Sequence, residues 1–405
     1  MQQRRKLRTV LGLFIFSFVL LSSAIAQGAL LPEKYEPVVS ANTCFGTRLV
    51  QKLLSGAGEK NLFISPYSIL SALALTSNGA SGVTLDVIQQ VLGLRETGER
   101  NVNTGFELLN ESLCHASGEI ELSVANSLWA REDIVFVQDF LDKAHSYYAA
   151  HVARVDFLDS SAPDMINGWV HEKTRGKIEN IVDGIDPLSI LFIVNAVYFQ
   201  GNWTRPFDPA LTSQMVFHSP SGVVKNHPMM RRAGRYHYLE AAGFQVVRIP
   251  YGCEEEMSLY AFLPEESRTL TSFVQGLSGE SLTDWISDME PMQGTLAFPR
   301  FTVSYEVNLK DVLVALGMGV AFDPNEADFQ RMTQLQAWIN KVKHKAALQI
   351  DEKGSEAAAA TSVEMRVTSV ARDTFSIVFD RPFFYLIRDD QTGVVLFCGM
   401  FVEPA

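Results

Sequence analysis

Small or apolar side chains alternate with mostly polar ones along the stretch from Ser355 to Val367. The small or apolar set ends in Val363, Met365 and Val367. A period of two is typical of a β-strand that has one face on a core. The alanine run from Ala357 to Ala360 instead favours a helix by local propensity. Because one segment supports two interpretations, the sequence predicts a segment with two conformational states.

Elsewhere the spacing of apolar residues predicts helices in the first third of the chain and mostly strands after it. Ser65 or Ser68 can cap the second helix, with Pro66 in its first turn. The continuous apolar run at 188–199 indicates a strand that is buried on both faces. The expected helices are 41–55, 66–78, 83–94, 137–148, 165–174 and 307–316, and the other expected strands are 122–129, 245–249, 257–263, 295–303, 346–350 and 383–388.

These elements indicate one large α+β domain, because no Pro-rich tract, charge block or repeat divides the 405-residue chain. The formal net charge of -12 argues against nucleic acid or an anionic membrane as the main partner.

Residues 1–26 have the pattern of a cleaved secretory signal peptide. A basic start precedes an apolar run at 10–21 that is short for a membrane span. A small-x-small site, Ala24 to Ala26, then precedes Gln27. A membrane anchor is the alternative, but no second apolar stretch of that kind follows. We therefore expect a secreted, extracellular protein, or a periplasmic one in a bacterium, whose mature domain covers 27–405.

The residues that could carry catalysis or bind a metal lack the necessary spacing. The four cysteines show no C-x-x-C pattern, and the sequence leaves open whether they pair as disulfides or stay free: Cys44, Cys114, Cys253 and Cys398. There is no G-x-S-x-G, and His171-Glu172 is not followed by a second histidine at zincin spacing. We expect no enzyme activity, no metal and no cofactor.

Five motifs occur in a fixed order along the chain: Asn61 to Ile69, Asn195 to Trp203, Val342 to Ala346, the segment Glu352 to Ala360, and the C-terminal run from Arg381 to Gly399. Together they closely resemble the serpins, a family of serine protease inhibitors. The resemblance implies a single domain in which helices pack around a large central mixed β-sheet. Further antiparallel sheets and an exposed reactive loop at about 352–379 are also implied.

The resemblance also implies inhibition by a suicide-substrate mechanism. A serine protease would cleave the loop as an acyl-enzyme, and the freed hinge would enter the central sheet as a new strand. The small hinge residues favour an inhibitor, expected to be monomeric, over a non-inhibitory carrier or chaperone. The residues that match the family's hinge are Glu352, Gly354, Ser355, Glu356, Ala357, Ala358, Ala359 and Ala360.

Two counts place the reactive bond differently. Seventeen residues from Glu352 inclusive, as in the family, give the bond between Thr368 and Ser369. Counting back from Pro382 gives a bond near Arg372, and Arg366 is a further candidate. A threonine there suits an elastase- or subtilisin-like protease, whereas either arginine would suit a trypsin-like one. A cysteine protease is a less expected target.

By the same resemblance, five residues would control the opening of the central sheet. His344 matches a histidine that joins a buried polar cluster, and Trp203 would line the other end of the opening. The alternative for each of them is ordinary packing. The remaining members of the cluster are Ser65, Ser68 and Asn195.

Overall fold

The computed structural model describes residues 32–57, 60–114, 119–355 and 374–404. The expected signal peptide at 1–26 lies outside these ranges, as do residues 356–373. The compact unit that carries the fold is Lys34–Ala405.

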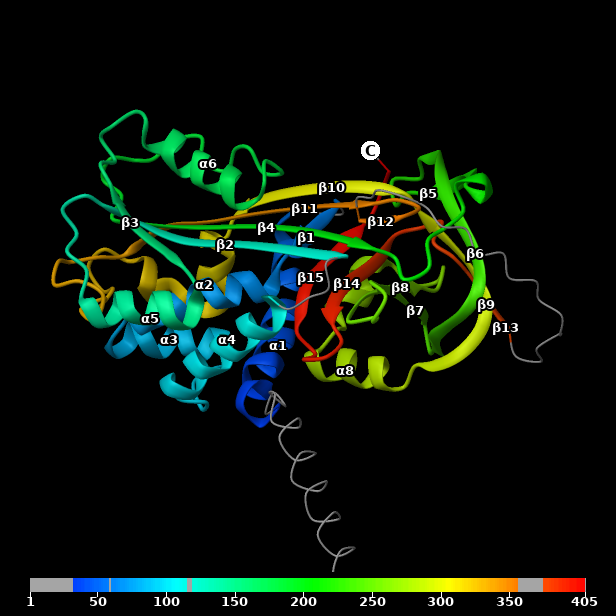
Figure 1. Cartoon of the computed structure of the whole chain (residues 1–405), viewed down its shortest axis with the longest axis horizontal. Coiled ribbons are helices and arrows are strands. Elements are labelled where there is room, and N and C mark those ends of the chain that lie inside the picture. Colours follow the sequence, from blue (N-terminus) through cyan, green and yellow to red (C-terminus); the bar gives the residue numbers. More distant parts are fainter. Residues whose placement is uncertain (1–31, 58–59, 115–118, 356–373, 405) are drawn as a thin grey trace, which may run out of the picture. The chain divides into compact units, whose positions relative to one another are not determined.

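The first helices of the chain lie together on one side of the central sheet (Figure 1). All residues of α2 are buried. Ser65 caps α2, since its side chain accepts a hydrogen bond from the Ser68 amide, and Pro66 occupies the first turn. Helices α2, α3 and α5 lie where the apolar spacing predicts them, whereas α1 begins earlier than the expected 41–55 and α4 was not predicted. Their bounds are α1 Pro32–Ala57, α2 Pro66–Asn78, α3 Gly82–Leu92, α4 Glu99–Cys114 and α5 Gln138–Tyr148.

The central sheet has six strands in the order β10-β11-β4-β2-β3, and the short β12 pairs with β4. It is mixed, because β11 runs parallel to β4 and β2 parallel to β3, whereas the other pairs are antiparallel. Ten of the twelve β4 residues are buried, as the apolar run predicts. The strands are β2 Ile120–Arg131, β3 His151–Val155, β4 Leu191–Asn202, β10 Phe301–Asn308, β11 Ile339–Ile350 and β12 Gly354–Ser355.

Helix α6 (Ala162–Lys173) lies on the face of the central sheet opposite α2 (Figure 1). Its Ile166 and Val170 pack in one apolar cluster with Phe192 and Val194 of β4.

A second sheet of nine strands has the order β1-β15-β14-β8-β7-β6-β9-β13, with β5 paired to β6. Helices α7 (Leu270–Gln275) and α8 (Gly279–Ser287) precede β9. The strands are β1 Leu62–Ile64, β5 Ser213–His218, β6 Val224–Ala241, β7 Phe244–Tyr251, β8 Met257–Pro264, β9 Glu290–Pro299, β13 Thr374–Val378, β14 Phe383–Asp389 and β15 Val395–Phe401.

Further expected elements differ in the structure, since the strand expected at 346–350 already begins at Ile339. The single strand expected at 295–303 is broken at Arg300, because β9 and β10 belong to different sheets. The helix expected at 307–316 begins only at Lys310, since Val307 and Asn308 still pair with β11. In the described part of the chain, no helix combines the length and apolar character needed to cross a bilayer.

Candidate functional site

The first two residues that follow the tight turn after β11 form the strand β12. The Asp351 carboxylate caps this turn, because it accepts hydrogen bonds from the Lys353 and Gly354 amides at 2.9 and 3.3 Å. β12 then runs antiparallel to β4, with Gly354 opposite Asn202 and Ser355 opposite Gly201. The predicted hinge therefore begins inside the central sheet.

Gly354 approaches β4 so closely that only glycine fits. Its φ is +148°, a value that other residues rarely adopt. A Cβ atom at this position would lie 2.1 Å from the Gly201 carbonyl oxygen and 2.6 Å from the Asn202 Cα. Any side chain would thus push the turn away from the end of β4.

Ser355 is fully buried, and its Oγ lies 3.2 Å from the hydroxyl of Tyr251 on β7. Burial raises the pKa of Tyr251, so this phenol stays protonated. The Tyr251 ring stacks on Trp203, with 4.2 Å between the ring centroids. The hinge residue Ser355 therefore sits in a buried environment beside two stacked aromatic rings, where a charged side chain would be costly.

Trp203, just after β4, fixes the turn through two hydrogen bonds. Its backbone amide donates to the Lys353 carbonyl at 2.8 Å, and its indole Nε1 donates to the Asp351 carbonyl at 2.9 Å. Glu352 is also largely buried, and its carboxylate accepts a hydrogen bond from the Thr212 hydroxyl at 2.8 Å. The conformation of the turn thus depends on contacts with β4 and with the segment before β5.

A second group of predicted residues surrounds His344 on β11. The imidazole Nε2 accepts a hydrogen bond from the Ser65 amide at 3.2 Å, so the proton is on Nδ1, which donates to the Asn195 side-chain oxygen at 2.5 Å. Burial lowers the pKa of His344 to about 3, which keeps the ring neutral.

The side-chain amide of Asn195 donates to the Ser68 hydroxyl and to the Asn126 side-chain oxygen. The Ser68 hydroxyl donates to the same Asn126 oxygen at 3.1 Å. Ser65, Ser68, Asn195 and His344 therefore meet in one buried cluster, which links α2 to three strands of the sheet.

Asn126 on β2 belongs to this cluster, although sequence reasoning missed it. It is directly opposite Asn195 in the β2–β4 pairing. A signal was present, because an asparagine within an expected apolar strand is unusual and needs a buried partner.

The cluster bridges the seam between β4 and β11, where His344 is opposite Asn195. The two strands stay paired as far as Ala347 and Tyr198, and β12 occupies the place beside β4 only at its end. Separating β4 from β11 would break the His344–Asn195 hydrogen bond. The arrangement can therefore resist the entry of a new strand at this seam.

The five predicted control residues form two separate groups, with Trp203 apart from the cluster around His344. Trp203 lies eight residues from Asn195 along β4, a separation of roughly 26 Å. The hinge positions Glu356 to Ala360 and the reactive-bond candidates Arg366, Thr368, Ser369 and Arg372 lie outside the described residues.

Comparisons with known proteins agree with this architecture. The chain is 32% identical to Serpin B6 of Pongo abelii over 376 residues, covering 91% of this chain and 99% of that protein. It is 33% identical to the corticosteroid-binding globulin of Pongo abelii, covering 93% and 92%. The crystal structure of tengpin, a thermophilic serpin in the native state, superposes with a TM-score of 0.85 at 28% identity, covering 90% of this chain and 94% of tengpin.

The sequence profile of the serpins, described as serine protease inhibitors, matches residues 40–404. The relatives include a globulin named for steroid binding, so membership alone does not imply inhibition. From the matched profile, the shared architecture and the relatives, this chain belongs to the serpin family.

Proposed function

We propose that this protein is a secreted serine protease inhibitor that works as a suicide substrate. The observation that supports this most strongly is the register of β12. Ser355 is opposite Gly201, and the two strands are antiparallel. Continuing this register along β4 would place Ala357 opposite Phe199, Thr361 opposite Asn195 and Val363 opposite Ile193.

This register would turn the small and apolar set of the hinge toward the core. Ser355 faces Tyr251, and Phe199, which is two residues from Gly201 on the same face of β4, packs edge-on against Tyr251 with 5.0 Å between the rings. Residues at spacings of two from Ser355 share its face. A slip of one residue would instead direct Glu356 and Glu364 into the core.

The opposite face of the seam is suited to the polar set. Lys341, Lys343 and Lys345 share one face of β11. Lys343 and Lys345 pair with Glu306 at 2.8 and 3.2 Å, whereas Lys341 lies over the Phe192 ring. The extended register would bring Glu364 opposite Phe192, beside Lys341, where the two charges would attract each other.

The chemistry begins when the catalytic serine of the protease attacks a loop carbonyl. We infer the bond between Thr368 and Ser369, with Arg366 and Arg372 as alternatives. The peptide C–N bond breaks, the Ser369 amine leaves with a proton, and Thr368 stays attached as an ester. Insertion would add ladder hydrogen bonds and bury Val363 and Met365, at about 1.5–3 kcal/mol for each side chain. The inserted hinge would move the attached protease away before the ester is hydrolysed.

The second candidate is a non-inhibitory carrier. A cavity of about 350 Å³ opens between β8, β14 and α8, lined in part by Tyr260, Ile286 and Met289. This volume is at the lower end of the range for small-molecule sites. A carrier would bind its ligand without forming a covalent complex with a protease.

Incubation with pancreatic elastase tests the proposal. The wild-type protein should give an SDS-stable complex, and Ser355→Arg should give only cleaved protein and active elastase, because an uncompensated charge cannot enter the site beside Tyr251. Ser213→Arg on β5 is the matched control, since Ser213 is exposed, and it should form complex normally.

Mass spectrometry of the C-terminal peptide released by the protease identifies the reactive bond. A C-terminal peptide that begins at Ser369 would support Thr368, whereas one that begins at Val367 or Asp373 would move the bond to Arg366 or Arg372. If no protease that cuts the loop yields a covalent complex, the inhibitory function is wrong and the carrier function gains support.

A further inference from the structure

The edge of the second sheet where the chain re-enters it at Thr374 carries a basic face. β6, β9 and β13 are paired so that Arg235 is opposite Gln293, which is opposite Thr374. The same face carries Thr295 and Ser376, whose hydroxyls are hydrogen-bonded at 3.1 Å. Three strands therefore present a polar, hydrogen-bonding surface at this edge.

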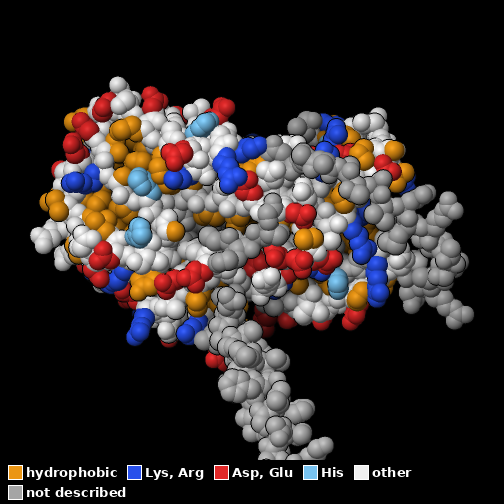
Figure 2. All heavy atoms as spheres, viewed as in Figure 1, with side chains coloured by type: hydrophobic (Ala, Val, Ile, Leu, Met, Phe, Trp, Pro, Cys, Tyr) orange, Lys and Arg blue, Asp and Glu red, His pale blue; other side chains and the backbone are white. Residues whose placement is uncertain are grey.

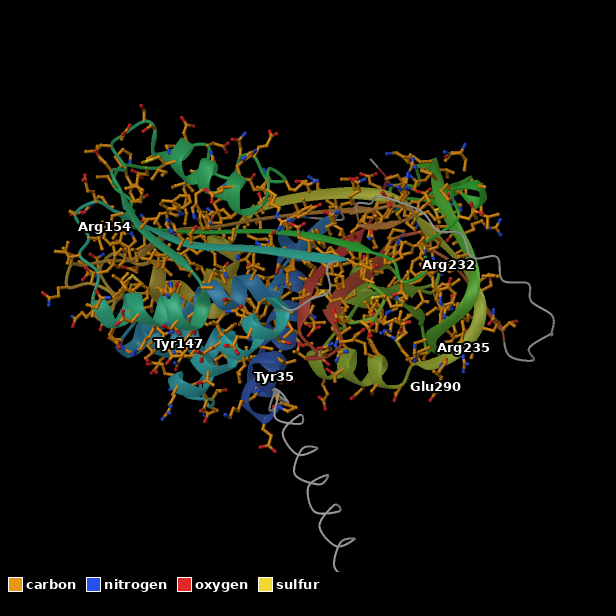
Figure 3. All side chains as sticks on the ribbon, in the orientation of Figure 1. Tyr35, Tyr147, Arg154, Arg232, Arg235 and Glu290 are labelled. Atoms are coloured by element: carbon orange, nitrogen blue, oxygen red, sulfur yellow. The ribbon has the colours of Figure 1, made fainter. Side chains whose placement is uncertain are left out.

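Along β6 the basic residues of this surface follow the strand alternation. Arg231, Arg235 and His237 are exposed, whereas Tyr236 and Tyr238 turn inward and pack on Phe375. We call Arg231, Arg235 and His237 the β6 basic face. Figure 3 labels Arg235 on this part of β6, and Figure 2 shows Lys and Arg side chains gathered there.

No ion pair among the described residues includes Arg231 or Arg235. By contrast, Arg248 on β7 and Arg388 on β14 of the same sheet both form ion pairs with the Asp390 carboxylate. Arg231 and Arg235, four residues apart on one face of β6, therefore present positive charge to solvent in a chain whose net charge is -12. An acidic surface is the chemistry that would complement them.

The position of this face fits the partner of the reactive loop. Two strand spacings separate Arg235 from Thr374, which is about 10 Å. The candidate bonds from Arg366 to Arg372 lie two to eight residues before Thr374, at most about 29 Å of extended chain. A protease domain of about 230 residues is roughly 45 Å across. A protease bound at any of these bonds would therefore reach the β6 basic face.

We propose that the β6 basic face is an exosite that attracts an acidic surface of the target protease. The proposal rests on the inhibitory function above and restricts the target to serine proteases with carboxylates beside the active-site cleft. Attraction of this kind raises the association rate and weakens with salt. Two arginines would release few counterions from a sulfated polyanion, so a protein partner is favoured.

Anionic and cationic trypsin are suitable probes, because they share a specificity and differ in surface charge, and Arg366 and Arg372 offer both enzymes a bond in the loop. The measurement is the second-order rate of loop consumption, counted on gels as complex plus cleaved protein. At 20 mM salt the variant Arg231→Glu/Arg235→Glu should react with anionic trypsin about tenfold more slowly than wild type. The difference should shrink at 200 mM salt, and cationic trypsin should react no more slowly.

The charge-matched control is Arg100→Glu/Arg154→Glu. Both arginines are exposed, on α4 and β3, and Figure 3 labels Arg154 at the opposite end of the described fold from Arg235. This control should react with both enzymes as wild type does, and an unchanged unfolding temperature would show that each variant is folded.

Equal rates for variant and wild type, or equal losses with both trypsins, would overturn the exosite. If the rates are unchanged and the variant is also retained less strongly than wild type on immobilised heparin, the face is a polyanion site and not an exosite for the protease. The inhibitory function is tested separately, by measuring the fraction of consumed protein that becomes SDS-stable complex. Cleavage by trypsin without complex would exclude Arg366 and Arg372 as the inhibitory bond, and inhibition would be refuted if elastase also gave no complex. In either case the rates still report on the β6 basic face.

Discussion

At the residue scale, the neutral, fully buried imidazole of His344 makes the free energy of unfolding depend on pH. Its pKa is about 3 in the folded protein and about 6.5 in the unfolded chain. Between these values the unfolded chain binds a proton that the folded protein does not. Stability therefore falls as the pH falls from 6.5 toward 3, by up to about 1.4 kcal/mol per pH unit from this group.

Replacing His344 by Gln removes this group but leaves an amide that can replace part of the hydrogen bonding. We expect the variant to unfold at a lower temperature than wild type at pH 7.5, because the cluster around Asn195 is then imperfect. The gap should narrow steadily toward pH 4.5, as followed by circular dichroism. The control is His145→Gln, because His145 is exposed. If the unfolding temperatures of wild type and His344→Gln differ by the same amount at every pH in this range, the neutral buried state of His344 is wrong.

Sequence reasoning placed Ser65, Ser68, Asn195 and His344 together because their motifs resemble those of a family. Their geometry could not be predicted, since a hydrogen bond such as Ser65 amide to His344 joins residues 279 positions apart. Asn126 was missed for a related reason, because it lies outside the quoted motifs.

At the scale of elements, local pattern predicts well where several local signals agree. Helix α2 matches its predicted range 66–78 because its apolar positions, its cap and its proline agree. The helix expected at 307–316 begins three residues later in the structure, at Lys310, because pairing with β11 holds Val307 and Asn308 in β10. The strand β12 is only two residues long, and its register depends on contacts with β4 that no local pattern contains.

Gly354→Ala tests the close approach of β12 to β4. A Cβ atom would collide with the Gly201 carbonyl, and the φ of +148° would add strain of about 1–3 kcal/mol. We expect the turn to move off Trp203, so that acrylamide quenches the tryptophan fluorescence more strongly than in wild type. Gly184→Ala is the control, since a Cβ there meets nothing within 4 Å. Equal quenching in Gly354→Ala and wild type would show that the turn tolerates the side chain.

At the scale of the whole molecule, the resemblance predicted one domain with a central mixed sheet, and the described fold agrees. The sequence could not show that β4 and β11 are paired directly along most of their length. That pairing defines a form in which the seam still has to open before a strand can enter.

A cut in the loop should therefore stabilise the molecule. Insertion would add about a dozen ladder residues at roughly 0.5–1.5 kcal/mol per hydrogen bond, so the unfolding temperature should rise by roughly 10 °C or more. Differential scanning calorimetry before and after a single cleavage within 361–372 measures this rise. The cleaved Ser355→Arg variant serves as the comparison and should gain much less. An unchanged temperature for the cleaved wild-type protein would mean that the hinge does not insert.

The start of β4 at Leu191 has a consequence for how such a protein can change its target. In the register set by Ser355, Leu191 is opposite Met365, so Thr368 would lie beyond the end of the strand. Substitutions at position 368 would then alter which protease is recognised without altering any residue that enters the sheet. Natural variation, or an engineer, could redirect the inhibitor through this one position while the parts that trap the protease stay the same.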